Sequence, residues 1–109
     1  MSEEIVIFVT ACSNEEAEKI ARHLVDEGLA ACVNIIPAVS SVFRWQGKIN
    51  QVKETLLIIK SVSTGLEAIT KRVKQLHSYQ VPEVIALPII GGLKEYLDWL
   101  RGETAAGSV

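Results

Sequence analysis

Apolar residues follow two periodicities along this chain, one typical of strands and one typical of helices. The run Ile5–Val9 is continuously apolar and mostly β-branched, which predicts a strand buried on both faces. Ser13–Glu16 then has the form of a capping box at the start of a helix. Gly28 stands where that helix is expected to end. One apolar helix face is formed between these two points, by Ala17, Ile20, Ala21, Leu24 and Val25.

A long hairpin is expected next. Ala30–Ile36 predicts a second strand that Pro37 interrupts and that resumes over Ser40–Trp45. Gln46–Lys48 has the composition of a turn. The segment Val52–Ser61, which has an apolar run at its centre, predicts a third strand.

The last third of the chain predicts a helix, a strand and a short final helix. Ser63–Glu67 offers a second helix start, and Val84–Ile90 reads as a fourth strand. The final helix is expected over Leu93–Leu100, and residues 102–109 are expected to form a frayed tail. The apolar face of the second helix consists of Leu66, Ile69, Val73 and Leu76.

This order of elements is βαββαβ with an added C-terminal helix, which predicts an α+β, ferredoxin-like sandwich. The right-handed crossover rule puts the first and third strands at the centre of the sheet. The second and fourth strands become edges, and proline, which is confined to edges and bulges, occurs in or beside both of them. We expect residues 1–109 to form one domain.

The arms of the hairpin from Ala30 to Ser61 are longer than two helices can cover. Long exposed edge strands invite pairing with another chain. We therefore predict a closed homo-oligomer held by strand pairing between subunits. The alternative is a twisted hairpin whose tip is solvated.

Composition narrows the range of partners. The chain has 109 residues, 49% of them hydrophobic, and a formal net charge of -2. It contains no cluster of Lys and Arg, which argues against nucleic-acid binding, and no run long enough to span a membrane. Its two cysteines, Cys12 and Cys32, form no CxxC pair. These features predict a cytoplasmic protein with reduced thiols.

Polar chemistry is concentrated in the segment His77–Glu83, immediately before the fourth strand. His77 and Glu83 together are a plausible pair of ligands for a divalent metal such as Cu(II). The competing interpretations are that His77 caps the second helix and that Glu83 pairs with a nearby basic side chain. Cys12, close to a helix start, is a further possible soft ligand.

Three other residues are candidates for lining a pocket. Lys60 ends the apolar run of the third strand, and it either extends to solvent or faces a pocket. Tyr79 and Trp45 are amphipathic aromatics that suit a ligand pocket or a subunit interface, and we favour the interface for Trp45. No motif for nucleophilic catalysis, phosphate binding or an organic cofactor is present, so we do not expect an enzyme.

The chain resembles the CutA divalent-cation-tolerance family. The motifs that carry the resemblance cover nearly the whole chain: Leu29–Ile35 with Pro37, Phe43–Lys48, Leu57–Lys60, His77–Glu83 and Tyr96–Leu100. It implies a ferredoxin-like homotrimer in which long hairpins pair between subunits. It also implies a role in tolerance of copper and other divalent cations.

The family's proposed metal ligands are a cysteine late in the first strand and the histidine and glutamate of an HxYxxPE motif. The last two correspond to His77 and Glu83, whereas the cysteine position is Val9 and the family's usual proline is Ser78. Loss of the thiolate argues against Cu(I) and leaves weak binding of Cu(II) or a similar ion. The alternative function is a small-molecule or protein-binding module. It is suggested by similarity to the PII signalling proteins, with ligands held in clefts between subunits.

Overall fold

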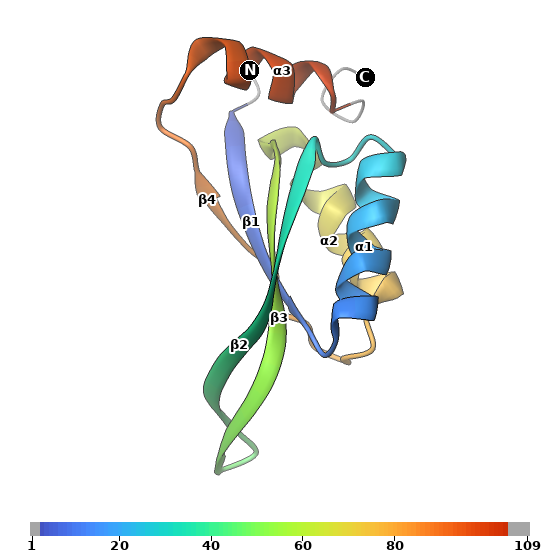
Figure 1. Cartoon of the computed structure of the whole chain (residues 1–109), viewed down its shortest axis with the longest axis vertical. Coiled ribbons are helices and arrows are strands. Elements are labelled where there is room, and N and C mark those ends of the chain that lie inside the picture. Colours follow the sequence, from blue (N-terminus) through green and yellow to red (C-terminus); the bar gives the residue numbers. More distant parts are fainter. Residues whose placement is uncertain (1–2, 105–109) are drawn as a thin grey trace.

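A computed structural model of the chain describes residues 3–104. Figure 1 shows a sheet with two helices on one face and a third helix across its upper end. In chain order the elements are β1 (Glu4–Ala11), α1 (Asn14–Asp26), β2 (Cys32–Trp45), β3 (Lys48–Val62), a 3₁₀ turn η1 (Ser63–Gly65), α2 (Leu66–Leu76), β4 (Ile85–Pro88) and α3 (Lys94–Gly102).

The strand order in the sheet is β2-β3-β1-β4, and every neighbouring pair is antiparallel. The prediction that the first and third strands lie at the centre is therefore confirmed. Ile7 of β1 is paired with Ile59 on one side and with Ala86 on the other. Ile7 and Ile59 lie in the hydrophobic core beneath α1 and α2, whereas Ala86 on the edge strand is exposed.

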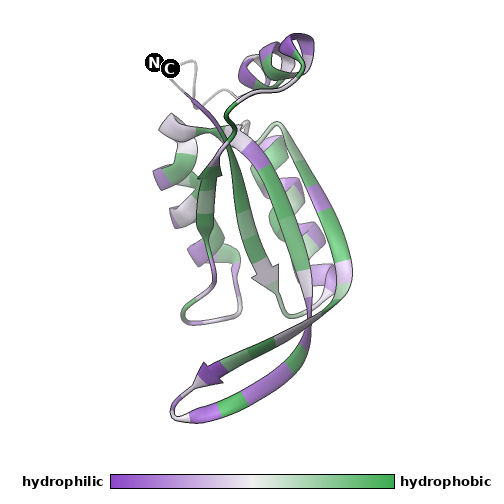
Figure 2. Ribbon diagram, turned by 90° about the vertical axis from the view of Figure 1, so that its left-hand side faces the viewer, coloured by the Kyte–Doolittle hydropathy of each residue, from purple (hydrophilic) through white to green (hydrophobic). Residues whose placement is uncertain are grey.

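The prediction that β1 is buried on both faces is wrong. Burial along β1 alternates, with Ile5, Ile7, Val9 and Ala11 buried beneath the helices and the residues between them only partly covered. The physical reason is that α1 and α2 cover the same face of the sheet, as Figure 1 shows. The other face, turned toward the viewer in Figure 2, carries apolar strand residues with no helical layer over them.

The predicted ends of α1 and the predicted C-terminal end of α2 are confirmed. The Ser13 hydroxyl caps α1 by accepting a hydrogen bond of 3.1 Å from the backbone N–H of Glu16. Gly28 ends the same helix at a φ of 74°, a backbone conformation that favours glycine. At the end of α2, His77 occupies the C-cap position and donates its backbone N–H to the carbonyl of Val73.

The two strands of the hairpin are longer and more continuous than the hydrophobic pattern predicts. Pro37 does not divide the second strand but lies in a bulge of β2, next to Ala38 at a φ of 61°. β3 begins at Lys48 rather than Val52, because the ladder continues residue by residue to the turn at Gly47. Figure 1 shows the two strands extending well below the helices.

The C-terminal region also differs from expectation. β4 covers only Ile85–Pro88, shorter than the predicted strand. Residues 102–104 are not frayed, because α3 continues to Gly102 and Thr104 is fully buried. An ion pair of 2.7 Å between Arg101 and Glu4 fixes α3 to the start of β1. Residues 105–109 of the predicted tail lie outside the described residues.

Candidate functional site

The loop over residues 77–84 packs against the start of α1. Glu16 makes this connection, because its carboxylate accepts the backbone N–H of Cys12 at 3.3 Å and that of Ser78 at 2.9 Å. Burial acts to raise the pKa of Glu16, but hydrogen bonds from Ser78 and Cys12 outweigh it and lower that pKa. Glu16, in the first turn of α1, therefore anchors the loop that carries the candidate site.

The His77 side chain is fully buried, and both of its ring nitrogens have protein partners. Nδ1 accepts the backbone N–H of Tyr79 at 3.0 Å, and Nε2 lies 2.7 Å from the carbonyl oxygen of Thr10. A carbonyl can only accept, so the neutral tautomer with the proton on Nε2 satisfies both bonds. The Glu16 carboxylate lies 3.7 Å from Nδ1.

Tyr79 connects the same loop to the long hairpin. Its hydroxyl donates a hydrogen bond of 2.8 Å to Oε2 of Glu54 on β3. Glu54 is only 7% exposed. Burial and the bond to Glu54 raise the pKa of Tyr79, so the phenol remains a donor.

Glu83 lies close enough to Glu54 for their charges to repel. Partial burial of its carboxyl group and the charge of Glu54 raise the pKa of Glu83. The predicted His77–Glu83 pair is thus separated into two environments, since the contacts of His77 go to Thr10, Tyr79 and Glu16. Within residues 3–104, no group of three or more His, Cys, Asp or Glu side chains is arranged to hold a metal ion.

A cavity of about 850 Å³ opens between this loop and the distal half of the hairpin. It contains two of the three predicted pocket residues, Tyr79 and Trp45, together with Glu83. Lys60 is not part of its lining. The Lys60 side chain projects from the uncovered face of the sheet and donates a hydrogen bond to the amide oxygen of Asn34. The full lining is Thr10, Cys12, Ser41, Val42, Phe43, Trp45, Asn50, Val52, Lys53, Glu54, Tyr79, Gln80, Val81 and Glu83.

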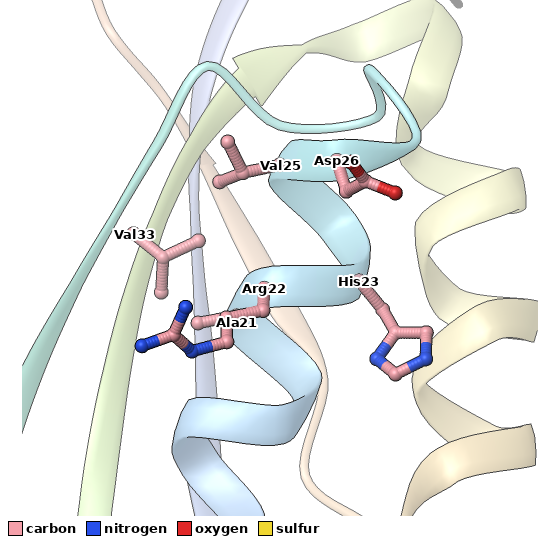
Figure 3. A pocket seen from close by; sticks show the side chains of 6 residues that line it. All are labelled: Ala21, Arg22, His23, Val25, Asp26 and Val33. Atoms are coloured by element: carbon pink, nitrogen blue, oxygen red, sulfur yellow. The ribbon is translucent and has the colours of Figure 1, made fainter.

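A second, shallower hollow of about 550 Å³ lies between α1 and β2. Figure 3 shows that its charged side chains diverge: Arg22 extends beneath Val33, while the ring of His23 points toward the neighbouring helix. His23 forms a local hydrogen bond, in which Nδ1 donates to the carbonyl oxygen of Lys19 at 2.8 Å. We assign no site to this hollow because its polar groups do not converge on a common point.

Neither Val9, which stands at the family's cysteine position, nor Cys12, the possible soft ligand, completes a metal site among the described residues. Val9 is fully buried in the core. Cys12 is exposed, and its sulfur accepts from the Ser78 hydroxyl at 3.6 Å. The side chains that could bind a metal therefore lie on the 77–83 loop, just before and within α1, and on β3. They do not come together in one site.

The match to known proteins agrees with this fold and these motifs. The model of the family described as "CutA1 divalent ion tolerance protein" matches residues 5–103. The chain belongs to this family. It is 50% identical over 101 residues to a divalent-cation tolerance protein CutA of Thermus thermophilus, covering 93% of this chain and 98% of that one. The sequence prediction of the family is confirmed.

Solved CutA structures have the same fold. The Thermus thermophilus protein superposes with a TM-score of 0.92 at 49% identity, covering 94% of this chain and 99% of that chain. A structure from Archaeoglobus fulgidus, described as a periplasmic divalent cation tolerance protein, gives a TM-score of 0.90 at 44% identity, covering 93% and 98%. The ferredoxin-like α+β prediction is thereby confirmed.

Two relatives, from a plant and from human, are longer than this chain. The Arabidopsis thaliana protein, described as chloroplastic, is 50% identical over 100 residues, which are 92% of this chain but 55% of that protein. The human protein is 45% identical over 101 residues, 93% of this chain and 56% of that protein. The chain thus spans about half the length of these relatives. No helix within residues 3–104 is both long and apolar enough to cross a membrane.

Sequence reasoning missed two residues of the site, Glu54 and Glu16. Glu54 lies within β3, two residues before its apolar run, so a charged residue inside a central strand was the available signal. In the sequence, Glu16 is the last residue of the predicted capping box, and that role alone explains a glutamate at this position. Its second role depends on Ser78, which is 62 residues away in sequence.

Proposed function

We propose that this protein acts in divalent-cation tolerance by binding Cu(II) or a similar divalent ion weakly, as a cytoplasmic homotrimer. The observation that carries the proposal is the proximity of the Glu83 and Glu54 carboxylates in the cavity beneath the hairpin. The proposed role is binding rather than catalysis, with no organic cofactor, nucleic acid or membrane as a partner. Residues 1–109 would act as one domain.

Two neighbouring carboxylates favour a divalent cation for an electrostatic reason. Each ionised group disfavours the other, which is part of why the pKa of Glu83 is raised. A divalent cation between them replaces that repulsion with two attractions, and carboxylate oxygens are common ligands of such ions. Glu83 is exposed and accessible, whereas Glu54 is already held by Tyr79.

His77 is the second proposed ligand, and its environment supports weak binding. Nδ1 could bind a metal only after losing the hydrogen bond from the Tyr79 N–H. Such a loss costs about 0.5–1.5 kcal/mol, in addition to the movement of a buried ring. With Val9 in place of a thiolate, the remaining imidazole and carboxylate donors suit Cu(II) better than Cu(I).

The proposed trimer is supported by the uncovered face of the sheet. Directly paired positions on that face carry large apolar side chains, namely Val6, Phe8, Ile58, Ile85 and Leu87. Figure 2 shows this apolar face with no helix over it. Burying such a face against other copies of the chain removes apolar area from water, and a closed ring also covers strand edges. A neighbouring subunit would then supply further ligands for the cation.

Calorimetry with Cu(II) tests the metal proposal directly. We compare the unmodified protein with Glu83→Gln and His77→Ala, and we use His23→Ala as the matched control because it removes the chain's other histidine. Loss of binding in the first two variants with normal binding in the control is the expected result. Equal binding by all four proteins would reject both proposed ligands. Circular dichroism verifies that His77→Ala remains folded.

The second candidate function is a small-molecule-binding module like the PII signalling proteins. The observation that favours it is the size of the cavity, about 850 Å³, with Trp45, Tyr79 and Phe43 in its wall. A thermal-shift screen tests it, because a ligand that binds only the folded state raises the melting temperature. A screen in which only metal ions stabilise the protein would argue against this candidate.

A further inference from the structure

The imidazole of His77 is enclosed by two segments of its own chain. The end of β1 provides the carbonyl oxygen of Thr10, to which Nε2 donates at 2.7 Å. The loop after α2 provides the backbone N–H of Tyr79, which donates to Nδ1 at 3.0 Å. The ring has no exposed area, and both bonds are made within one chain. The enclosure therefore does not depend on which surfaces face other copies.

The Glu16 carboxylate joins the same two segments. One oxygen accepts the backbone N–H of Cys12 at 3.3 Å, and the other accepts that of Ser78 at 2.9 Å. Cys12 comes two residues after Thr10, and Ser78 comes directly before Tyr79. A single side chain of α1 thus fixes the positions of the two backbone groups that hold the imidazole.

These hydrogen bonds also decide which tautomer the ring adopts. The carbonyl of Thr10 can only accept, so it requires a proton on Nε2 of His77. A carboxylate free to approach Nδ1 would favour the opposite tautomer, with the proton on Nδ1. The nearer oxygen of Glu16 instead stays 3.7 Å from Nδ1, beyond hydrogen-bond distance, because it is bound to the Cys12 N–H. Nδ1 therefore keeps its lone pair on the side that faces Glu16.

The negative charge of Glu16 is not neutralised by a basic side chain. Among the ion pairs of residues 3–104, Glu16 pairs with no Lys or Arg. Its side chain is only 12% exposed, so solvent screens the charge poorly. A weakly screened negative charge beside a nitrogen lone pair attracts a cation to that nitrogen.

We propose that Glu16 is a positioning residue that sets the affinity of His77 for a divalent cation. It holds the ring in one tautomer through its hydrogen bonds, and it places a negative charge beside Nδ1. This inference rests on the cation-binding function proposed above and adds a residue of α1 to that site. Side chains that orient a metal-binding histidine commonly change metal affinity by about 10–100-fold.

Loss of Glu16 has two opposing effects on cation binding. A looser loop would release Nδ1 more easily from the Tyr79 N–H, which favours binding. Loss of the negative charge disfavours it. The second effect is expected to be larger, because attraction between charges shielded from solvent is stronger than one neutral hydrogen bond.

The first measurement is the tautomer of His77 in the metal-free protein. Two-bond ¹H–¹⁵N correlations report it at about pH 8, where an ordinary imidazole is neutral. His23 is an internal reference with the opposite tautomer, because its Nδ1 donates to the Lys19 carbonyl. Glu16→Gln keeps an oxygen that can accept from Ser78 and should retain the His77 tautomer. Glu16→Ala removes both acceptors and should give a mixture of tautomers.

The second measurement is calorimetric titration of Cu(II) into the full chain. Glu16→Gln and Glu16→Ala should each bind about tenfold more weakly than the unmodified protein, because both lack the charge. The matched control is Glu15→Gln, which removes an exposed carboxylate in the same helical turn. It should change neither the tautomer nor the affinity. Circular dichroism verifies that each variant is folded, and Glu16→Gln tests the charge even if Glu16→Ala unfolds.

The outcomes separate this inference from the function on which it rests. Unchanged Cu(II) affinity in Glu16→Gln would overturn the inference, as would a single unchanged tautomer in folded Glu16→Ala. Equal weakening by Glu15→Gln and Glu16→Gln would reduce the effect to the general charge of α1 and would also overturn it. Failure of the underlying function has a different signature, because His77→Ala would then bind Cu(II) as tightly as the unmodified protein.

Discussion

The hydroxyl of Tyr79 and the carboxylate of Glu54 are joined by a hydrogen bond of 2.8 Å that ties the loop before β4 to the long hairpin. Tyr79 also donates its backbone N–H to Nδ1 of His77. Tyr79 thus connects the buried imidazole of His77 to the Glu54 carboxylate in the cavity. Changes at this position are expected to affect the loop, the hairpin and the cavity together.

Tyr79→Phe tests the contribution of this bond to stability. The change leaves Oε2 of the buried Glu54 without its donor, which is expected to cost about 1–3 kcal/mol in the free energy of unfolding. Urea titration at fixed protein concentration measures it. Tyr96→Phe is the matched control, because it alters the chain's other tyrosine, which is 42% exposed. Equal costs for the two variants would contradict a special role for the Glu54 bond.

Glu16→Gln tests the anchoring of the loop through its dependence on pH. The folded-state pKa of Glu16 lies below its ordinary value of 4.5, so its ionisation stabilises the fold above that pH. That stabilisation is lost as pH falls through the lowered pKa. The unmodified protein should therefore lose more stability than Glu16→Gln between about pH 5 and pH 3.

Thermal melts across this pH range provide the measurement for Glu16. The matched control is Glu15→Gln, an exposed carboxylate in the same helical turn. Its pH profile should follow that of the unmodified protein. Parallel profiles for Glu16→Gln and the unmodified protein would show that the contacts to Ser78 and Cys12 do not favour the ionised form.

Glu83→Gln is expected to have the opposite sign near neutral pH. Because the pKa of Glu83 is raised in the folded state, its ionisation opposes folding as pH rises through that value. Removing the charge should raise the melting temperature at pH 7 by about 1–2 °C, a small effect because the exposed residue is screened by solvent. The difference should vanish at about pH 4. A lower melting temperature at pH 7 would contradict repulsion from Glu54.

Ile58→Lys tests whether the uncovered sheet face holds subunits together. Ile58 is paired with Phe8 on that face, and a charged side chain there could not be buried against another copy without a large cost. Sedimentation velocity at micromolar concentration should show a trimer for the unmodified protein and monomers for the variant. Ala68→Lys adds the same charge to an exposed position of α2 and should leave the trimer intact.

Circular dichroism must accompany that experiment, because loss of assembly has meaning only for a folded chain. A folded Ile58→Lys variant that sediments as the unmodified protein would exclude this face from the interface. Dissociation by Ala68→Lys as well would point to net charge rather than to the sheet face.

The elements of the fold were predictable because each follows from local pattern. Ser13 and Gly28 mark the ends of α1 through capping preferences that operate within one helical turn. The order of the strands followed from chain connectivity and the handedness of crossovers. The local pattern was misleading at two places. At β1, no element within residues 3–104 covers the second face of the sheet, so burial alternates along the strand. At the C-terminus, α3 continues to Gly102 and Thr104 after it is buried.

The sequence by itself determined the family and the topology, and it singled out the segment His77–Glu83 as the candidate site. Only the tertiary structure decided what each side chain of that segment contacts. The partner of the His77 ring at Thr10 is 67 residues away, and the partner of the Tyr79 hydroxyl at Glu54 is 25 residues away. Periodicity reports which face of an element is buried, but hydrogen bonds between distant residues depend on how the elements pack. For that reason the sequence indicated a His77–Glu83 pair. In the packed structure, His77 instead donates to the backbone carbonyl of Thr10, and Glu83 lies near the Glu54 carboxylate.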